Sequence, residues 1–235
     1  MSELIAARLR HWVRDQGASP LLTYYDPERG ERVELSGVSA ANWVAKTSNL
    51  LVDELDVEPG DAVELTLAQD RPGHWVSLVW MLACWQVGAV VSLDRTEARV
   101  AVLGPDDPSA TAHADTVLVC SLHPLGLPLP GPLRRGALDY ALEVRSQPDQ
   151  HTAVPRSGLT LAWRDPDRQL TQADLVDRAG SGVRRLVRPT DPWATVRTAL
   201  VEPLLGGGST VVVAGSVDDE RLAEIAAQER VDADG

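Results

Sequence analysis

The sequence predicts a layered α/β fold with mostly parallel sheets, and two observations indicate it. Short apolar runs rich in valine alternate with helical stretches, most clearly over residues 62–93. A strand, helix, strand order of these lengths is typical of a right-handed parallel crossover, because two parallel strands need a connection that crosses the sheet. The 235 residues, 44% of them hydrophobic, are enough for one large domain or two small ones with a buried core.

The first quarter of the chain predicts a helix, a hairpin and a second helix. Residues 3–15 place apolar side chains at helical spacing before a Gly-Ala-Ser-Pro break. The β-rich runs 21–25 and 32–35 flank an Asp-Pro-Glu-Arg-Gly turn, which predicts a hairpin. Ser39 has the hydroxyl of a typical N-cap, so we expect it to start a helix that continues to Leu55.

The middle of the chain predicts one crossover unit. Residues 62–67 alternate apolar and polar side chains as a strand does, and 74–87 are apolar nearly all round. Such a helix is expected between a sheet and other elements. Gly88 ends it, and 89–93 form a short buried strand.

Two more parallel strands, 99–103 and 116–121, are predicted around a short helix at 109–113. Residues 123–132 carry four prolines and should form an extended connector, because proline cannot continue a helix or a sheet ladder. A short helix is predicted at 137–144.

The last third predicts further alternation of strands and helices. In order, these are a strand at 159–163, a turn at 164–168, a helix at 171–185, a helical segment at 193–205, a strand at 210–214 and a helix at 218–229. Thr171 and Asp218 are expected to be N-caps. Pro203 lacks an amide donor and should kink or break its helix.

These elements suggest a division of the chain into three parts. Residues 1–122 are the first α/β subdomain, 123–152 the proline-rich connector, and 153–235 a second, smaller α/β subdomain.

Composition excludes several classes of function. A formal net charge of -12 argues against nucleic acid as a partner, because nucleic-acid binding needs a basic surface. No window approaches the roughly 18 apolar residues of a membrane span, and the N-terminus lacks the apolar core of a signal peptide, so no membrane partner is predicted. Cys84 and Cys120 lie in apolar surroundings without metal-ligand spacing, which predicts buried reduced thiols. We therefore expect a cytoplasmic protein.

Three groups of residues are predicted to be structural. The five histidines lack short ligand spacings, so no metal is predicted and solvated or capping roles are expected; they are His11, His74, His113, His123 and His151. Residues 206–208 are three glycines that follow a helix and enter a strand, which favours a tight turn over a phosphate loop. Trp75, Trp80 and Trp85 rotate around one helix and should serve packing or an interface.

One block of sequence carries a family resemblance. Residues 56–63 contain a Pro-Gly-Asp turn and 87–93 a Gly-Ala-Val close, separated by a strand and an apolar helix. This order resembles the opening of the AMP-binding adenylate-forming enzymes, the acyl-CoA synthetase and peptide-synthetase adenylation group. Residues 204–213 resemble a later strand entry of the same enzymes. The resemblance implies the fold of their N-terminal domain, truncated.

The resemblance also implies a site. These enzymes hold ATP with a Ser/Thr-Gly-rich loop that carries a Pro-Lys pair. The corresponding place here keeps Ser157, Gly158 and Thr160 and lacks that pair, and Arg164 is the nearby cation. These four are the predicted cofactor-binding residues, with ATP or AMP and Mg²⁺ as the implied ligands; the alternative is a strand that begins after a Ser-Gly turn. Lys46 is the only lysine, and an arginine does not reproduce the reach of a lysine.

Other motifs of the family are missing from the sequence: the Tyr-Gly-x-Thr-Glu segment for adenine and Mg²⁺, a Gly-Asp downstream of the Ser157 segment for ribose, and the lid lysine. No catalytic residue is predicted, and a complete adenylation cycle is not expected on this chain alone.

Three hypotheses follow. The first is a non-catalytic ligand- or partner-binding homologue, a pseudoenzyme. The second is the N-terminal half of a split AMP-forming acyl-CoA ligase. The third is a regulatory interaction module without nucleotide binding, whose partner is an acyl-CoA synthetase-like protein or a second copy of the chain.

Overall fold

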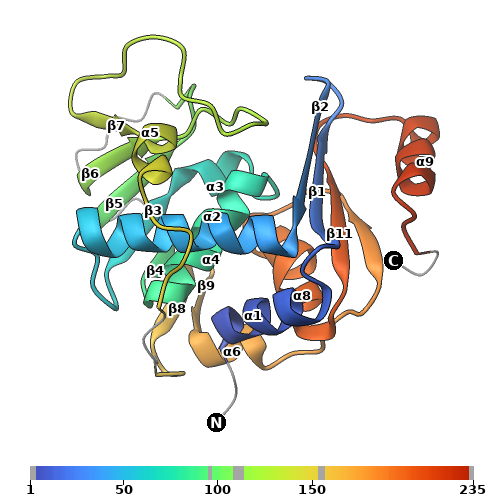
Figure 1. Cartoon of the computed structure of the whole chain (residues 1–235), viewed down its shortest axis with the longest axis horizontal. Helices are drawn as coiled ribbons and strands as arrows, with labels where there is room; N and C mark the ends of the chain where they lie inside the picture. Colours follow the sequence, from blue (N-terminus) through green and yellow to red (C-terminus); the bar gives the residue numbers. More distant parts are fainter. Residues whose placement is uncertain (1–3, 95–96, 108–113, 153–156, 233–235) are drawn as a thin grey trace.

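The computed structural model describes residues 4–94, 97–107, 114–152 and 157–232, and its strands form two sheets (Figure 1). The strands are β1 (Pro20–Asp26), β2 (Glu31–Ser36), β3 (Ala62–Leu65), β4 (Val90–Ser92), β5 (Ala98–Leu103), β6 (Ala114–Val119), β7 (Ala137–Asp139), β8 (Leu161–Asp165), β9 (Arg168–Thr171), β10 (Arg184–Val187) and β11 (Ser209–Val213). Sheet A has the order β10-β11-β1-β2, and sheet B has the order β7-β6-β5-β3-β4-β8-β9.

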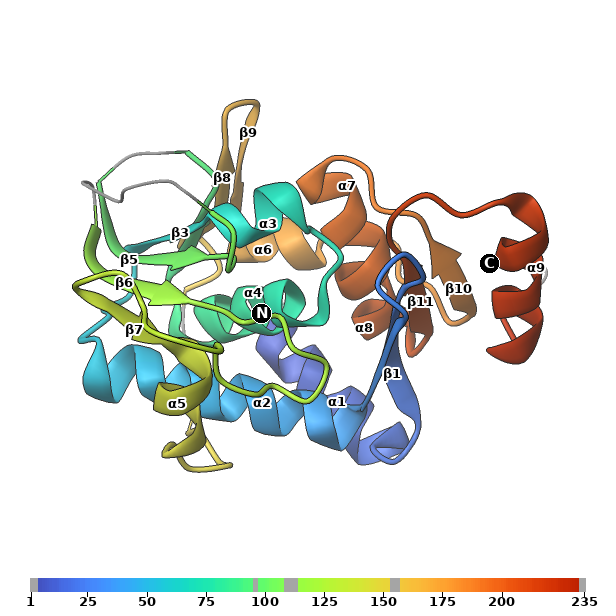
Figure 2. The same cartoon turned by 90° about the horizontal axis from the view of Figure 1, so that it is seen from above.

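The helices pack between and around these sheets. They are α1 (Ile5–Gln16), α2 (Gly37–Asn49), the π-helical turn η1 (Leu50–Glu54), α3 (Thr66–Asp70), α4 (Trp75–Val87), α5 (Tyr140–Arg145), α6 (Gln172–Val176), α7 (Pro192–Val196), the π-helical turn η2 (Arg197–Val201), α8 (Glu202–Gly206) and α9 (Asp219–Gln228). Figure 2 shows α4 between the two sheets and α9 beyond the outer face of sheet A.

The predicted layered fold with mostly parallel sheets is confirmed. In the described part of the chain, only the hairpins β1–β2 and β8–β9 are antiparallel. The crossover unit behaves as predicted, since β3 and β4 pair in parallel and α4 connects them. No helix among the described residues has the length and apolar character that a membrane span needs.

Each of the two sheets combines strands from both sides of the expected boundaries at residues 122 and 153. Sheet A combines β1 and β2 from the N-terminal region with β10 and β11 from the C-terminal region. Sheet B combines β3 to β7 with β8 and β9, because β8 pairs in parallel with β4. Each sheet therefore contains strands from both outer parts of the chain.

The helix α4 is the centre of the core. All of its residues are buried, and Trp75, Trp80 and Trp85 are 2%, 0% and 1% exposed. The Trp85 indole donates a hydrogen bond to the carbonyl oxygen of Ala162, 2.9 Å away, which ties α4 to β8. Gly88 ends the helix with φ at 83°, a conformation that glycine adopts without strain. Of the two roles predicted for these tryptophans, packing and an interface, their burial supports packing.

The second helix begins earlier than predicted. Its N-cap is Ser36, whose hydroxyl accepts a hydrogen bond from the amide of Ser39, and Ser39 lies in the first turn. Both serines have a capping side chain, so the sequence alone does not distinguish them. The strand β2 ends at Ser36, which places that residue at the junction with the helix.

The predicted helix at 171–185 is wrong beyond its first turns. Thr171 caps α6 as expected, through a reciprocal capping box with Asp174. The helix ends at Val176, and β10 begins at Arg184. The intervening loop packs backbone against backbone on the 206–208 turn: a Cβ atom on Gly180 would lie 2.4 Å from the amide nitrogen of Gly206. Only glycine permits this close approach of the two backbones. The loop packed in this way occupies the place of the predicted helix.

The expected kink at Pro203 takes a different form. α7, η2 and α8 follow one another without interruption, and the π-helical turn immediately precedes the proline. A π turn widens the helix and so accommodates a residue that lacks an amide donor and crowds the previous turn. The glycine triplet then forms the predicted turn, with Gly207 in the left-handed region at φ 79°.

Most of the other predicted elements are confirmed within a few residues. The exception is 137–144, which begins as the strand β7 and continues as α5. Residues 123–132 contain no helix or strand, as expected of a connector. The predicted helix at 109–113 lies outside the described residues. Cys84 and Cys120 are free and buried, as predicted, and burial raises the pKa of both thiols.

The helix α9 is attached to the outer face of sheet A by a buried polar network. Glu229, just past the end of α9, accepts hydrogen bonds from the hydroxyl of Tyr25 at 2.5 Å and from Nε of Arg32 at 2.9 Å. Its second oxygen accepts from Nη2 of Arg184 at 2.8 Å. Burial raises the pKa of Glu229, but these hydrogen bonds outweigh it and the pKa is lowered. Ile225 of α9 packs beside this network.

Candidate functional site

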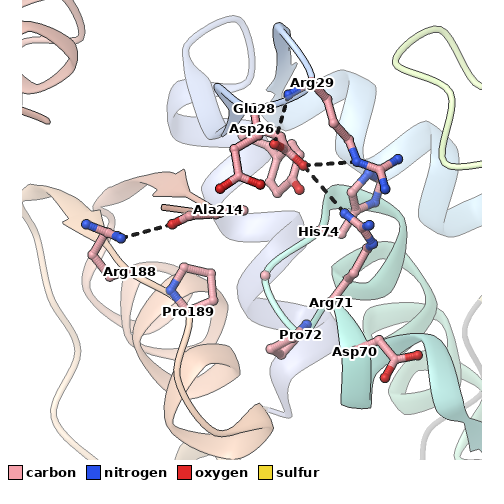
Figure 3. A pocket seen from close by; sticks show the side chains of 13 residues that line it. Asp26, Glu28, Arg29, Asp70, Arg71, Pro72, His74, Arg188, Pro189 and Ala214 are labelled. Carbon is pink, nitrogen blue, oxygen red and sulfur yellow. Dashed lines mark hydrogen bonds and ion pairs between the residues drawn. The ribbon is translucent and has the colours of Figure 1, made fainter. Parts of the chain in front are cut away.

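A pocket of about 370 Å³ lies at the edge of sheet A where β1, β10 and β11 end (Figure 3). We call it the arginine pocket, after the three arginines in its lining; the residues used below are Asp26, Arg29, Arg71, His74 and Arg188. In open α/β sheets, ligands bind at the carboxyl ends of parallel strands, because the strand ends and helix N-termini present polar groups there. The position of the pocket therefore makes it the leading candidate for a functional site.

Four separate segments supply the lining. Asp26 is the last residue of β1, and Arg29 follows in the turn to β2. Arg71 and His74 belong to the short loop between α3 and α4, and Arg188 comes directly after β10. Figure 3 shows Arg188 on one side of the pocket and the Arg29 and Arg71 side chains on the other, near His74.

The loop between α3 and α4 is held against sheet A by a glycine. A Cβ atom on Gly73 would lie 2.8 Å from a methyl carbon of Val212 in β11 and 3.1 Å from the ring of Pro189. A larger residue would push the loop away from the strand ends. This close approach brings Arg71 and His74 to the carboxyl edge of sheet A.

Asp26 is the buried carboxylate of the pocket, at 4% exposure. It accepts a hydrogen bond from the backbone amide of Arg29 at 3.3 Å. Its other oxygen lies 3.6 Å from Nε of Arg29 and 3.5 Å from Nη1 of Arg71. Both ion-pair distances exceed the roughly 2.7–2.9 Å of a strong charge-assisted hydrogen bond. The two guanidinium groups are thus held near Asp26 without being tightly bound to it.

His74 is the second buried polar residue of the pocket, at 2% exposure. Its Nδ1 accepts a hydrogen bond from the amide of Val76 at 3.2 Å, so it acts as the N-cap of α4. An accepting Nδ1 carries no proton, so the neutral ring is protonated at Nε2. That Nε2 is buried and has no hydrogen-bond partner among the described residues.

The charge state of His74 follows from its surroundings. Burial, together with the nearby positive charges of Arg71 and Arg29, lowers its pKa to about 3. The ring therefore stays neutral at physiological pH, with one N–H group directed away from the helix cap. The Tyr24 ring packs against it, with ring centroids 4.7 Å apart, and burial raises the pKa of that tyrosine to about 12.

The remaining charges of the pocket are balanced. Glu28 accepts a hydrogen bond from the amide of Ser216 at 2.8 Å, and Nη2 of Arg188 donates to the carbonyl oxygen of Gly215 at 3.0 Å. Asp70 completes the lining acids. Three arginines and three carboxylates face one another, so the pocket suits a ligand of low charge better than a polyphosphate.

The predicted phosphate-binding residues fall into two separate places. Ser157, Gly158 and Thr160 share one turn before β8, where the Ser157 hydroxyl accepts from the amide of Leu159 at 3.2 Å and the carbonyl oxygen of Ser157 accepts from the amide of Thr160. The Gly158 and Thr160 carbonyl oxygens accept from the amides of Ala173 and Gln172. The turn is therefore braced onto the start of α6.

Arg164 lies toward the other end of β8. Four residues of extended chain separate it from Thr160, about 13 Å. Its Nη2 donates to the Ser92 hydroxyl at 3.1 Å, and its Nε lies 3.5 Å from the carboxylate of Asp94. The structure thus does not bring Arg164 to the Ser157 turn, and nucleotide binding at that turn stays a prediction.

The single lysine has a structural position. Nζ of Lys46 in α2 donates to the carbonyl oxygen of Gln147 at 2.5 Å and lies 2.7 Å from the carboxylate of Asp149. Asn49, one turn further along, binds the carbonyl oxygens of Pro148 and Gln150. These contacts fasten the segment after α5 to α2. Among the described residues, no group of three or more His, Cys, Asp or Glu side chains could hold a metal ion.

The sequence prediction missed the arginine pocket, although part of its signal was present. His74 was expected to be solvated or capping, and it caps α4. Asp26 closely follows a predicted strand, and the carboxyl end of a strand is where ligands bind in open α/β sheets. Arg71 follows a strand of the other sheet, so the pattern does not place it beside Asp26. The position of Arg188 at this edge is not predicted, because the sequence predicts a helix over residues 171–185 where β10 begins.

Known proteins share this fold. A crystal structure of an acyl-CoA synthetase from Brucella canis aligns with a TM-score of 0.73 over 97% of the chain, at 17% sequence identity. The N-terminal domain of FACL13 from Mycobacterium tuberculosis aligns with a TM-score of 0.69 over 98% of the chain, at 14% identity. The chain spans 46% and 62% of those two chains, so about half of the Brucella protein has no counterpart in it. The predicted resemblance to the N-terminal part of acyl-CoA synthetases is confirmed at the level of fold.

One curated protein is similar in sequence. It is a TIGR03089 family protein from Mycobacterium tuberculosis (strain ATCC 25618 / H37Rv), 35% identical over 220 residues, which are 91% of this chain and 87% of the relative. No family model matches the chain. The identity extends over nearly the full length of both proteins, and the chain therefore belongs to the TIGR03089 family.

Proposed function

We propose that this protein is a non-catalytic ligand-binding homologue of the acyl-CoA synthetases, which uses their N-terminal scaffold without carrying out adenylation. One observation carries the proposal. The carbonyl oxygens of the Ser157 turn accept hydrogen bonds that brace it, whereas the arginine pocket holds a buried donor, Nε2 of His74, without a partner among the described residues.

The chemistry of adenylation supports the same proposal. Attack of a carboxylate on the α-phosphate of ATP builds negative charge, which enzymes stabilise with convergent cations and amide donors. The only cation of the predicted set is Arg164, which lies about 13 Å along β8 from Thr160. Its side chain contacts Ser92 and Asp94. The lone lysine is bound to the segment after α5. The predicted residues therefore do not form one cradle around a phosphate.

The experiment is a pyrophosphate exchange assay combined with calorimetry. The purified chain is incubated with ATP·Mg²⁺, labelled pyrophosphate and carboxylic acids of short, medium and long chain length, beside a complete acyl-CoA synthetase as a positive control. We expect no exchange with any acid. Calorimetric titration with ATP·Mg²⁺ and with AMP uses the wild type and the variant that combines Ser157→Ala with Arg164→Ala.

The outcomes separate the hypotheses. Exchange above the level of a heat-treated sample would overturn the proposal. Saturable nucleotide binding that the double substitution removes, without exchange, would keep the non-catalytic proposal and place the nucleotide at the Ser157 turn. Equal binding by wild type and variant would place the nucleotide elsewhere on the chain.

A second candidate is the N-terminal half of a split ligase, and the coverage favours it. The chain aligns over 97% of its length with less than half of a complete acyl-CoA synthetase. A partner chain with the missing half would then complete the enzyme. This candidate predicts that exchange activity appears when the chain is mixed with such a partner and is absent from either chain alone.

A further inference from the structure

The strongest unexplained feature of the molecule is the buried N–H group of His74. The ring is 2% exposed, its Nδ1 is committed to the cap of α4, and Nε2 has no acceptor among the described residues. A buried donor without a partner costs about 1–3 kcal/mol of stability. The indole nitrogens of Trp75 and Trp80 are also buried without a partner among the described residues. His74 differs from Trp75 and Trp80 because it lines the arginine pocket, where a ligand can supply the missing acceptor.

Positive charge surrounds this donor. Arg71 and Arg29 both act on the His74 ring, as their effect on its pKa reflects. Each contacts one oxygen of Asp26 at 3.5–3.6 Å, and neither forms the parallel two-bond pairing that arginine makes with a carboxylate in ideal geometry. The two guanidinium groups are thus positioned beside the pocket with capacity for a second anionic partner.

The helix α4 adds to the positive electrostatic potential near His74. It has 13 residues, and its N-terminus lies at the pocket, where the helix dipole carries partial positive charge. On the opposite side, Arg188 is anchored to the carbonyl oxygen of Gly215. His74 and three arginines therefore line a space of about 370 Å³, within the usual range of small-molecule sites.

We propose that the arginine pocket binds the oxyanion group of a small ligand, a carboxylate or a phosphate monoester, with Nε2–H of His74 as the buried donor and Arg71 and Arg29 as the countercharges. This proposal rests on the proposed ligand-binding function and names the site and chemical class of the ligand. Glu28 and Asp70 also line the pocket, so we expect the remainder of the ligand to be polar and to carry little further negative charge.

The balance of charge excludes larger anions. Asp26, Glu28 and Asp70 offset the three arginines, so a triphosphate would place several uncompensated charges in the pocket. A single carboxylate or phosphate monoester instead shares the two arginines with Asp26. An oxygen of this ligand accepts the hydrogen bond that Nε2–H of His74 otherwise does not make.

The experiment is an NMR titration of the full chain with ¹⁵N-labelled histidine, using inorganic phosphate and acetate as separate probes and chloride as the ionic-strength control. The variants are Arg71→Gln and His74→Asn. Asparagine is chosen because its side chain can still cap α4, so the substitution removes the Nε2–H donor and spares the cap. Arg221→Gln on the exposed face of α9 is the matched control, since this arginine pairs with Glu224 of the same helix, away from the lining of the arginine pocket.

We expect a saturable shift of the Nε2 resonance of His74 with phosphate, acetate or both, and none with chloride. Arg71→Gln should weaken binding about tenfold, the loss of one charge-assisted contact. Calorimetry should detect no binding to His74→Asn and unchanged binding to Arg221→Gln. The relative affinities of phosphate and acetate identify which oxyanion the ligand carries.

Two results would overturn the proposal. One is the absence of any saturable shift with both anions in the wild type. The other is undiminished affinity in Arg71→Gln, a partly exposed position at which the fold is expected to persist. Neither result depends on pyrophosphate exchange. Exchange activity with normal anion binding would refute only the non-catalytic function, whereas no exchange together with no anion binding would refute only this site.

Discussion

The two faces of strand β1 carry two clusters of charged residues that differ in how completely their hydrogen bonds are made. On the outer face, Glu229 accepts hydrogen bonds from Tyr25, Arg32 and Arg184 at 2.5–2.9 Å. On the inner face, Asp26 lies 3.5 Å or more from its nearest guanidinium nitrogens, and the neighbouring His74 has a buried donor without a described partner.

This difference arises from the alternation of side chains along one strand. Neighbouring residues of β1 point to opposite faces, so Tyr25 joins the outer cluster while Tyr24 and Asp26 line the inner one. A complete network is what the attachment of α9 needs. An incomplete network costs stability and leaves donors that another molecule can use, so the comparison contrasts structural charges with those proposed to bind a ligand.

The largest expected effect comes from Glu229→Gln in the outer cluster. The substitution replaces a buried carboxylate oxygen with an amide donor that faces the donors of Arg184 or Arg32. We expect a loss of about 3 kcal/mol in the free energy of unfolding, because it leaves an arginine uncompensated in a mostly buried site. Urea denaturation measures the loss, and anion binding by the folded variant should not change.

Glu224→Gln is the matched control for this prediction. Glu224 pairs with Arg221 on the exposed surface of the same helix, so its loss should cost less than about 0.5 kcal/mol. Equal effects of the two substitutions would contradict the comparison, because the outer cluster would then contribute no more than a surface ion pair.

The second effect is a pH dependence that originates in the inner cluster. The pKa of His74 is lowered from 6.5 to about 3 on folding, so the unfolded chain binds more protons between these values. Stability from this group is complete above pH 6.5 and is lost as the pH falls toward 3. Between pH 6.5 and about 5 the loss should reach about 2 kcal/mol for one buried histidine.

The measurement is the free energy of unfolding of wild type and His74→Asn over this range of pH. The difference between the two proteins isolates the histidine from the carboxylates, which titrate lower. We expect a shallower slope in the variant. Parallel slopes would mean that folding does not lower the pKa of His74, so the ring would be protonated in the folded protein in the lower part of this pH range.

The third effect comes from a substitution in the inner cluster that removes a charge and keeps the size of the side chain. Asp26→Asn removes the negative charge that Arg29 and Arg71 share, and we expect a loss of about 1 kcal/mol in stability since both arginines are partly exposed. Affinity for phosphate should rise about tenfold, because the pocket gains one net positive charge close to the ligand. Calorimetric titration measures this change. Weaker binding would show that Asp26 positions the arginines more than it competes with the anion.

Sequence patterns predicted the scaffold well, because its elements are specified locally. The apolar helix that ends at Gly88 and the hairpin around the Asp26 turn need only nearby residues to explain them. Thr171 and Asp218 cap their helices as predicted for the same reason.

The candidate site depends on long-range contacts, and so its prediction was incomplete. The apolar and arginine-rich stretch before Arg188 suits a helix by propensity, yet Gly180 and Gly182 let the backbone pack on the 206–208 turn and the chain pairs with β11 instead. Arg188 reaches the carboxyl edge of sheet A only because β10 forms there. Similarly, Gly73 places Arg71 beside Asp26 through a contact with Val212, and sequence spacing contains no sign of it.

The smallest expected effect tests the motif at which the sequence resemblance implies a cofactor site. Ser157 is exposed, and its hydroxyl accepts one hydrogen bond, from the amide of Leu159. Ser157→Ala should therefore cost about 0.5 kcal/mol or less in unfolding free energy and leave phosphate affinity within about twofold of the wild type. A loss of phosphate affinity as large as that of Arg71→Gln would move the anion from the inner cluster of sheet A to the turn before β8. The Ser157 turn would then be the site, and the unmade hydrogen bond of His74 would not identify where the ligand binds.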